Sequence, residues 1–344
     1  MTALLVRWPA WWFNKVPLSV TLVLLLADGR RFSAGVLAVL ALVVLTVCAV
    51  GNYGYALNDL FDVEEDRRAG RANAVTAGGA RRMQAIVAVS AACAVAFAAA
   101  AAGTAGALIT LAELALPAAY SIPPVRVKER RWLGVAADGL AAHVYPAVLA
   151  LIAAAHWSLR PLTPLLAASV VVWAVAAGAR GILSHQLHTA DRDAAAGLRT
   201  VVHDVGARRL ERSVAFGLIP LEVAGFGGAL IACDGGIVLW TGVGLYLLYE
   251  AYKTLSGRFR VTAFRPQGQR YVPFAEESFY KSWGPLVLAL DCARADLRYL
   301  LLLAAYALLF RPHLRTEWGR LRAVRDALRT ARSKARGVRS SGGA

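Results

Sequence analysis

The sequence has little charge and little cysteine for its length, and both scarcities exclude classes of protein. Charged residues make up only 17% of its 344 residues, which is below the share in an average soluble domain. The four cysteines are scattered and form no CxxC pair, so neither a zinc site nor a disulfide framework is indicated. Acidic residues are especially few, with 22 aspartates and glutamates against 38 lysines and arginines. An ordinary soluble domain and a disulfide-rich scaffold are therefore excluded.

Hydrophobic residues take the place of the missing charge. They make up 58% of the chain, and the mean hydropathy is +0.51, which is typical of a polytopic membrane protein. Eight apolar segments are long enough to cross a bilayer, at residues 8–27, 34–57, 85–102, 103–122, 132–155, 162–183, 214–233 and 235–251. A ninth candidate, 284–310, is interrupted by four charged residues between 291 and 298, so we expect its first half near the interface. The sequence thus predicts an all-α membrane helix bundle of about nine transmembrane helices.

Basic residues indicate how the bundle lies in the membrane. They gather in the loops after the second, fourth, sixth and eighth predicted helices, at 67–82, 126–131, 192–209 and 258–281. The positive-inside rule therefore predicts a multi-pass protein of the inner, cytoplasmic membrane, with these loops and the N-terminus in the cytoplasm. The first helix has no cleavage site after it and is expected to be retained. An odd ninth span conflicts with this topology, because it would place the strongly basic segment 311–344 outside.

Segment 311–344 is expected to form an amphipathic tail separate from the transmembrane domain, 1–310. Its hydrophobic residues recur at helical spacing opposite its arginines, at Leu314, Trp318, Leu321, Val324 and Leu328. This pattern is typical of a helix on anionic lipid, and a partner protein is the alternative. The last few residues are expected to be disordered. Nucleic acid binding is not expected, since most of the net charge of +16 lies in loops that flank membrane helices.

The acidic residues that are present concentrate at one membrane edge. Asn58, Asp59, Asp62 and Asp66 follow a long apolar run and precede a basic loop. If the helix continues through them, Asp59, Asp62 and Asp66 stand at i, i+3 and i+7 and share one face. Like charges so placed suit a divalent cation such as Mg²⁺, which binds carboxylate oxygens and substrate phosphates. The alternative, a solvated acidic helix end balanced by nearby arginines, fits the position at a membrane edge less well.

A faint internal repeat places a second acidic segment on the same predicted side of the membrane. Residues 58–70 align with 185–197, so that Asp66 corresponds to Asp193. The other aligned positions of the second copy are less acidic and are occupied by His185, Gln186 and Thr189, with Asp191 close by. Two acidic helix ends that converge would form one cation and phosphate site, which a single end cannot easily provide.

On these residues the sequence resembles the UbiA superfamily of intramembrane prenyltransferases. The first motif of that family, NDxxDxxxD, is met in full from Asn58 to Asp66. The stretch YSIPPVRVKERRWLG, at 120–134, is similar to the family's YSxPPxxxK loop. The resemblance covers roughly residues 7–310. The second family motif, an Asp-rich series, is incomplete at 185–193, which is similar to a less typical bacterial branch of the superfamily.

The resemblance implies a fold and a reaction. The fold is a bundle of nine helices around a cavity that is open to lipid and capped by the two acidic loops. The reaction starts from a prenyl diphosphate, whose charge Mg²⁺ neutralises as the allylic C–O bond breaks. Catalytic residues are implied at Asp59, Asp62, Asp66 and Asp193, which with Asn58 and Asp191 are also the implied Mg²⁺ ligands. Substrate-binding residues are implied at Arg71, Tyr120, Ser121, Arg126, Lys128, Arg180, His185 and Gln186.

Several of these residues also have structural interpretations. The basic residues of the 120–134 loop can serve as topology signals alone, and its first two residues can simply end a helix before the prolines. Arg180 can snorkel toward the interface. Glu113 and Asp138 are ionisable groups inside predicted spans, where they would orient or deprotonate an acceptor unless they only hydrogen-bond a neighbouring helix.

Three functions are compatible with this sequence. The first is transfer of the prenyl group to a lipophilic acceptor, a class that includes aromatic molecules. The second is a membrane terpene cyclase that uses a prenyl diphosphate without an acceptor, which the incomplete second motif favours. The third, an ion-coupled transporter, is disfavoured because the acidic residues lie at the interface and not at the midplane. The expected partners are therefore a prenyl diphosphate, a lipophilic acceptor and membrane lipids, and not nucleic acid.

Overall fold

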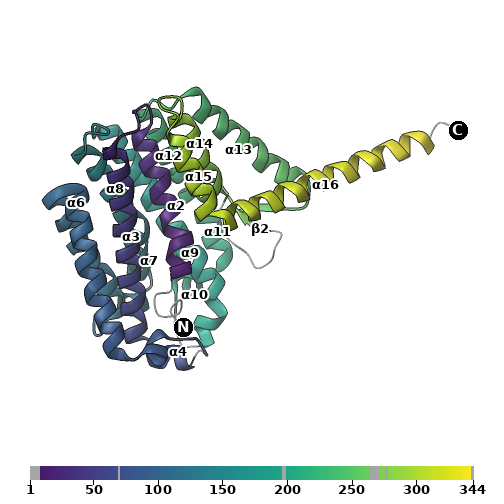
Figure 1. Cartoon of the computed structure of the whole chain (residues 1–344). Coiled ribbons are helices and arrows are strands. Elements are labelled where there is room, and N and C mark those ends of the chain that lie inside the picture. The colour runs from purple at the N-terminus through teal and green to yellow at the C-terminus, as the bar shows by residue number, and fades with distance from the viewer. Residues whose placement is uncertain (1–7, 69, 196–198, 264–270, 276–277, 342–344) are drawn as a thin grey trace.

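The chain forms a bundle of long helices (Figure 1). The computed structural model describes residues 8–68, 70–195, 199–263, 271–275 and 278–341. Five helical stretches among these residues are each long and apolar enough to cross a membrane, at Ala34–Phe61, Ala80–Ser121, Trp132–His156, Pro164–Asp191 and Ala207–Ala232. The expected all-α multi-pass membrane fold is therefore confirmed.

The main helices follow one another with short connections between most of them. They are α2 (Trp8–Ala27), α3 (Ala34–Phe61), α6 (Ala80–Ser121), α7 (Trp132–Gly139), α8 (Tyr145–His156), α9 (Pro164–Ala195), α11 (Ala207–Ser213), α12 (Ile219–Ala232), α13 (Ile237–Leu255), α14 (Gly284–Cys292), α15 (Tyr299–Leu309) and α16 (Arg311–Ser341). Three π-helical turns continue these helices, namely η2 (Leu140–Val144) between α7 and α8, η3 (Val214–Leu218) between α11 and α12, and η4 (Phe279–Trp283) before α14. The smaller elements are α4 (Val63–Arg68), α5 (Ala74–Gly78), η1 (Val127–Glu129), α10 (Val201–Val205) and the paired strands β1 (Arg260–Thr262) and β2 (Tyr271–Pro273). Buried valine, leucine and alanine side chains form one main core between the helices, as expected where close packing holds a bundle together in lipid.

Helix α6 folds back on itself between the predicted segments 85–102 and 103–122. Ala102 and Gly103 leave the helical conformation, and Gly103 adopts φ +62° and ψ −151°, a combination that glycine reaches without strain. Ala98 and Gly106 then face each other so closely that a Cβ on Gly106 would lie 2.2 Å from the carbonyl oxygen of Ala98. Helix α6 therefore supplies two of the predicted spans, joined by a tight turn.

The expected single ninth helix over 284–310 is wrong, because the chain turns between α14 and α15. The charged residues between 291 and 298 stabilise the turn between α14 and α15. Asp291 pairs with Arg294 at 3.3 Å, and Asp296 accepts hydrogen bonds from the amide and the guanidinium of Arg298. Charged side chains that would be costly inside a continuous span thus lie at an end of the bundle.

This turn decides where the C-terminal segment lies. Because α15 runs back along the bundle, α16 starts beside the first turns of α2, where the His313 ring is hydrogen-bonded to the carbonyl oxygen of Phe13 at 2.8 Å. Trp12 and Phe310 stack at the same place, with ring centroids 5.5 Å apart. The basic segment therefore starts at the N-terminal end of α2, and the conflict with an odd number of spans disappears.

The connections between the helices lie at the two ends of the bundle. At one end the Arg160 guanidinium donates to the carbonyl oxygens of Leu26, Asp28 and Cys233. This holds together three short connections, the ones that follow α2, α8 and α12. At the opposite end α4 lies across the ends of the long helices (Figure 1), together with the loops in which acidic and basic residues concentrate.

Candidate functional site

The candidate site forms where α3 ends. The expected continuous helix stops at Phe61, because Asp62 adopts φ −105° and ψ 12° and caps α3. Helix α4 then starts at Val63. Asp59, Asp62 and Asp66 are only 1%, 3% and 4% exposed. The acidic motif is therefore buried at the end of the bundle, and it is not a solvated helix end.

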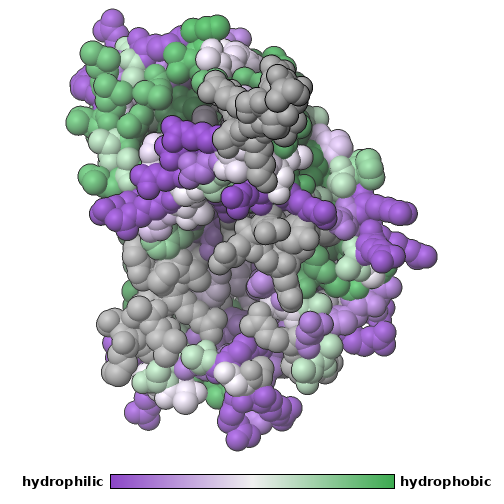
Figure 2. Space-filling model, turned by 90° about the vertical axis from the view of Figure 1, so that its right-hand side faces the viewer, coloured by the Kyte–Doolittle hydropathy of each residue, from purple (hydrophilic) through white to green (hydrophobic). Residues whose placement is uncertain are grey.

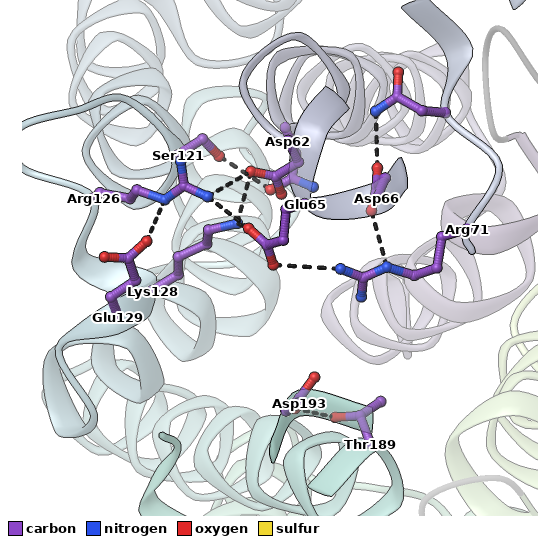
Figure 3. Close-up of polar contacts among 12 residues, drawn as sticks. Asp62, Glu65, Asp66, Arg71, Ser121, Arg126, Lys128, Glu129, Thr189 and Asp193 are labelled. Atoms are coloured by element: carbon purple, nitrogen blue, oxygen red, sulfur yellow. Dashed lines mark hydrogen bonds and ion pairs between the residues drawn. The ribbon is translucent and has the colours of Figure 1, made fainter. Parts of the chain in front are cut away.

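Asp62 and Glu65 share two cations from the loop after α6 (Figure 3). The Lys128 Nζ atom lies 2.7 Å from the Asp62 carboxylate and 2.9 Å from that of Glu65. One Arg126 Nη2 atom lies 3.1 Å from Asp62 and 2.6 Å from Glu65. The Arg126 Nε atom also contacts Glu129 at 2.6 Å. Each buried carboxylate is thus matched by a cation, as burial of charge requires.

The loop that supplies these cations is fixed by its own sequence. Pro123 and Pro124 follow Ile122, the extended residue that caps α6, as expected because proline removes a helical donor and disfavours a helical residue before it. Ser121, in the last turn of α6, donates a hydrogen bond to Asn58 Oδ1 at 3.3 Å. Arg126 then takes a left-handed φ of +32°, which turns the chain into η1. The 120–134 loop is therefore held against the acidic motif.

Asp66 and Asp59 are held by the segment that follows α4. The Arg71 Nε atom lies 2.9 Å from the Asp66 carboxylate. The Asn73 side-chain amide donates to the Asp66 carboxylate at 2.8 Å and to the Asp59 carbonyl oxygen at 2.9 Å. The Ala74 amide donates to the Asp59 carboxylate at 3.2 Å. Asp59 therefore faces the start of α5, and Asp66 faces Arg71.

The shared cations affect the two carboxyl groups of the cluster differently. Burial raises the pKa of Asp62 above its ordinary value, and Lys128 and Arg126 oppose this only in part. Burial also acts to raise the pKa of Glu65, but Lys128, Arg126 and Arg71 together outweigh it and lower that pKa. Of the two groups, Asp62 therefore takes up a proton more readily.

Asp193 on α9 faces this cluster from the opposite side of the site (Figure 3). Its carboxylate accepts a hydrogen bond from Thr189 Oγ1 at 2.6 Å. Asp191 stands two residues before Asp193 on the same helix. This spacing points the two side chains in nearly opposite directions, and Asp191 is exposed. His185 is also exposed, whereas Gln186 is buried. Of the acidic residues expected on α9, Asp193 is the one that the fold turns toward the first motif.

Tyr120 lies near acidic residues of both elements. Its hydroxyl interacts electrostatically with Asp62 and Glu65 of the first motif, with Asp193 of α9 and with Asp138. Tyr120 is therefore close to both copies of the internal repeat.

Arg180 lies deeper in the bundle, about 20 Å of helix before Asp193. Its guanidinium donates to both carboxylate oxygens of Glu222, at 2.7 and 2.6 Å, and to the carbonyl oxygen of Phe274 at 2.9 Å. Arg180 and Glu222 are each 1% exposed. This bidentate pair ties α9 to α12 and to the segment after β2.

A second group of ionisable residues lies around a small cavity in the bundle. The cavity has a volume of about 10 Å³, room for about one water molecule, and is lined by parts of α2, η2, α8 and α9, with Lys15 and His143 in its wall. Lys15 interacts electrostatically with His143 and with Glu113. Glu113 is 2% exposed, and neither of its carboxylate oxygens has a hydrogen-bond partner among the residues that the structure describes. Asp138 interacts with both Glu113 and Tyr120, so it links the cavity to the first cluster.

Two residues of the site were not expected from the sequence, Glu65 and Asn73. Glu65 stands three positions after Asp62, which is the same spacing that pointed to the aspartates. Asn73 precedes the short helix α5 and caps it by accepting a hydrogen bond from the Val75 amide at 2.9 Å. An asparagine before a helix is a recognisable capping signal, but its contact with Asp66 depends on the fold.

The carboxylates of the first motif do not converge on one point. Asp59, Asp62 and Asp66 each face a different partner, and across the described residues no three His, Cys, Asp or Glu side chains group as a metal site. Mg²⁺ in proteins commonly takes one or two carboxylates and completes its coordination with water and substrate phosphates. The carboxylate oxygens of the buried Asp62 and Asp66 and of the half-buried Asp193 fit that mode of binding and do not fit an all-protein metal cage.

These features define a polytopic helical membrane protein with a buried, charge-paired cluster at one end of its bundle. Residues 16–266 match the model of the UbiA prenyltransferase family, and the chain belongs to this family. The expectation drawn from the acidic motif is confirmed. The elements from β2 onward lie outside the matched range. No curated protein matches the sequence.

Solved structures of UbiA homologues share the fold. The chain aligns with a UbiA homologue from Archaeoglobus fulgidus bound to GPP and Mg²⁺ at 15% identity and a TM-score of 0.51, over 92% of this chain and 98% of that one. It aligns with a UbiA homologue from Aeropyrum pernix K1, without ligand, at 18% identity and a TM-score of 0.55, over 83% and 96% of the two chains. At these identities the likeness establishes the fold.

Proposed function

We propose that the protein transfers a prenyl group from a prenyl diphosphate to a lipophilic acceptor, in a reaction that depends on Mg²⁺. The observation that carries this proposal is the buried contact of Asp62 and Glu65 with Arg126 and Lys128 at the end of an apolar bundle. Such a cluster suits a metal-bound diphosphate, and the bundle beside it suits a prenyl chain. The Archaeoglobus fulgidus homologue bound to GPP and Mg²⁺ supports the same class of ligand.

The acidic residues take two roles in this proposal. Asp62 and Asp66 offer metal ligands on the α3–α4 side, and Asp193 offers one on α9. Mg²⁺ bound by them would neutralise the diphosphate and stabilise the leaving group. Asp59 and Asn58 are positioning residues, because Asp59 holds the Ala74 amide and Asn58 holds Ser121.

Arg126, Lys128 and Arg71 are the residues that bind the diphosphate directly. In the free protein their charges are matched by Asp62, Glu65 and Asp66. When these carboxylates act as metal ligands, the cations become available for phosphate oxygens, to which they form strong charge-assisted hydrogen bonds. The protein therefore exchanges internal ion pairs for pairs with the substrate, so the three cations are matched at both stages.

The bundle controls what happens to the prenyl group. The bond between C1 of the prenyl chain and the diphosphate oxygen breaks, and the diphosphate keeps both bonding electrons. A nucleophilic atom of the acceptor forms the new bond to C1, and the acceptor loses a proton. Tyr120 lies beside the cluster and offers an aromatic face to developing positive charge. The apolar interior keeps water from capturing that charge first.

We assign the acceptor to the region around the small cavity lined by Lys15 and His143, whose side chains would have to move apart to admit it. Glu113 lies near Lys15, and its carboxylate oxygens have no hydrogen-bond partner among the described residues. It is the group that would receive the acceptor's proton, with Lys15 balancing the charge. Asp138 interacts electrostatically with both Glu113 and Tyr120, so the acceptor region and the diphosphate site would lie close enough for the acceptor to reach the prenyl C1 atom. Arg180 is a positioning residue, because Glu222 and Phe274 already use its donors.

We place the acidic end of the bundle in the cytoplasm and the protein in the inner membrane. The loops at this end carry the basic residues that the positive-inside rule assigns to the cytoplasm. The return of α15 brings the start of the basic helix α16 to the N-terminal end of α2, in agreement with the same rule.

The test is product analysis with the purified protein in lipid nanodiscs. Farnesyl, geranylgeranyl and longer prenyl diphosphates are supplied with Mg²⁺ or with EDTA, and with or without a lipid extract of the host membrane. We expect diphosphate release and a prenylated product that require both Mg²⁺ and the extract. Asp62→Asn is the inactive control, and its folding is checked by thermal unfolding.

Two other outcomes would change the proposal. A cyclised hydrocarbon or alcohol formed from the donor alone would replace transfer with cyclisation at the same site. Absence of Mg²⁺-dependent diphosphate release with every donor would contradict the assignment of the cluster.

A further inference from the structure

The C-terminal helix α16 has one face that packs on the bundle. Val324 is 4% exposed, and Leu321 packs against the main core. The Tyr249 hydroxyl on α13 donates a hydrogen bond to the buried Glu317 carboxylate at 3.1 Å. With the contact of His313 to α2, these residues hold the first half of α16 in place.

The other face of α16 carries an exposed basic stripe. The stripe consists of six exposed residues spaced three or four positions apart, Arg311, Arg315, Trp318, Arg322, Arg325 and Arg329. Arg322 lies over the Trp318 ring, 5.3 Å from its centroid, and Trp318 is 56% exposed. The sequence pattern had grouped Trp318 with the leucines, but the fold turns Trp318 to the arginine side. The exposed acidic residue that the structure describes on α16 is Asp326, which contacts Arg325 at 3.1 Å.

Helix α16 leaves the bundle sideways from the end of α15 (Figure 1). Figure 2 views the molecule from the side to which α16 points and shows hydrophobic residues on the upper part and a hydrophilic band across the middle. Helix α16 also starts near the middle height of the bundle (Figure 1). Because α16 points toward the viewer in Figure 2, the hydrophilic band lies at the height of α16 itself, below the hydrophobic upper part.

We propose that the basic stripe of α16 binds anionic lipid headgroups of the membrane that holds the bundle, so that α16 lies along the membrane surface. Five arginines on one line complement a negatively charged plane. A tryptophan within that line suits the boundary between headgroups and acyl chains. The helix leaves the bundle below a hydrophobic surface, so the surface of a bilayer around that part of the bundle is within its reach. The proposal concerns α16 alone and does not depend on the reaction of the site.

The test measures amide hydrogen exchange in α16 of the full-length protein. The protein is placed in nanodiscs of phosphatidylcholine, with or without phosphatidylglycerol. An isolated helical segment in water opens readily, whereas a helix on a lipid surface is held closed. We expect exchange in α16 to slow by about tenfold or more with phosphatidylglycerol, since each basic residue strengthens binding to anionic lipid about fivefold. High ionic strength should remove most of the protection.

Two variants that lose the same number of charges show whether the protection of α16 depends on the basic stripe. The stripe variant carries Arg315→Gln, Arg322→Gln and Arg329→Gln, and it should lose most of the protection by phosphatidylglycerol. The control carries Arg81→Gln, Arg82→Gln and Arg208→Gln, which are equally exposed and change the net charge by the same amount. The control should keep the protection.

Three results would overturn the proposal. The first is the same exchange of α16 in both lipid compositions. The second is equal loss of protection in the control and the stripe variant. The third is protection that appears only with two proteins per nanodisc, which would assign the stripe to a second copy of this chain.

Discussion

At the scale of single residues, the site consists of carboxylates that are charge-matched inside the protein. Asp62 and Asp66 are buried and contact cations directly, whereas Glu64 contacts only Arg67 and Arg68 on the exposed side of α4 among its described partners. The same stretch of chain therefore contains both a candidate metal ligand and a matched surface acid.

We expect Asp62→Asn and Asp66→Asn each to lower kcat/KM for a prenyl diphosphate by about 10²-fold or more, because an amide is a weak Mg²⁺ ligand. Glu64→Gln should leave kcat/KM within about twofold, because loss of an exposed ion pair has little effect. The measurement is diphosphate release with Mg²⁺ in excess, with thermal unfolding as a check of folding. Full activity in either aspartate variant would refute the metal assignment.

Arg180 illustrates how a buried charge can serve the fold instead of the substrate. Arg180→Leu leaves Glu222 buried without its partner, which should destabilise the protein by about 3–5 kcal/mol. The double variant Arg180→Leu, Glu222→Leu should recover much of that loss, since a hydrophobic pair can replace a buried ion pair. Thermal unfolding and diphosphate release are measured for both variants. If the double variant were stable but inactive, Arg180 would be a substrate-binding residue.

At the scale of elements, the turn in α6 depends on the conformation of Gly103. We expect Gly103→Ala to destabilise the protein by about 1–3 kcal/mol, because its φ of +62° strains any residue with a Cβ atom, and the added atom would also lie 3.4 Å from the His156 ring. Gly227→Ala is the control, since it lies within α12 and its added Cβ meets nothing within 4 Å. The control should be neutral or slightly stabilising. Equal melting temperatures for the two variants would show that α6 does not need this turn.

A carboxyl pair joins α2 to α14 at the opposite end of the bundle. Asp28 follows α2, and burial together with the neighbouring Asp291 raises the pKa of Asp28 from 3.8 to about 6. The folded protein therefore binds this proton more tightly than the unfolded chain does. Stability gained from the protonated group is fully present below about pH 4 and is lost as the pH rises through about 6.

Asp28→Asn imitates the protonated group and should raise the melting temperature by about 2–4 °C near pH 8, and by less near pH 5. Asp234→Asn is the control at the same end, because Asp234 is exposed. The melting temperatures of both variants are followed across this pH range. A gain that does not change with pH would mean that ionisation of Asp28 does not affect this end of the bundle.

At the scale of the whole molecule, the basic tail is partly integrated into the bundle. His313, Glu317 and Val324 contact the bundle or lie buried. Removing 331–344 should therefore leave activity and the melting temperature unchanged. Removing 311–344 should lower the melting temperature, since it uncovers the surface on which these residues pack. Diphosphate release and thermal unfolding test both truncations, and equal behaviour would mean that α16 does not stabilise the bundle.

The sequence by itself determined the membrane class, the family and most of the spans. Apolar length identifies a span without any knowledge of its neighbours, because a helix in lipid must satisfy its own backbone hydrogen bonds. The division at Gly103 was visible for the same reason. The acidic motif and the 120–134 loop were also recognisable, because their residue types and spacing are local properties of the chain.

Only the tertiary structure decided which charges meet. Glu65 joined Lys128, Arg180 paired with Glu222, and Trp318 turned to the arginine side. The tertiary structure also resolved the ninth candidate into α14 and α15, which placed the start of the basic tail beside α2. The physical reason is that a buried charge is tolerated only beside a partner, and that partner can come from any element that the fold brings close.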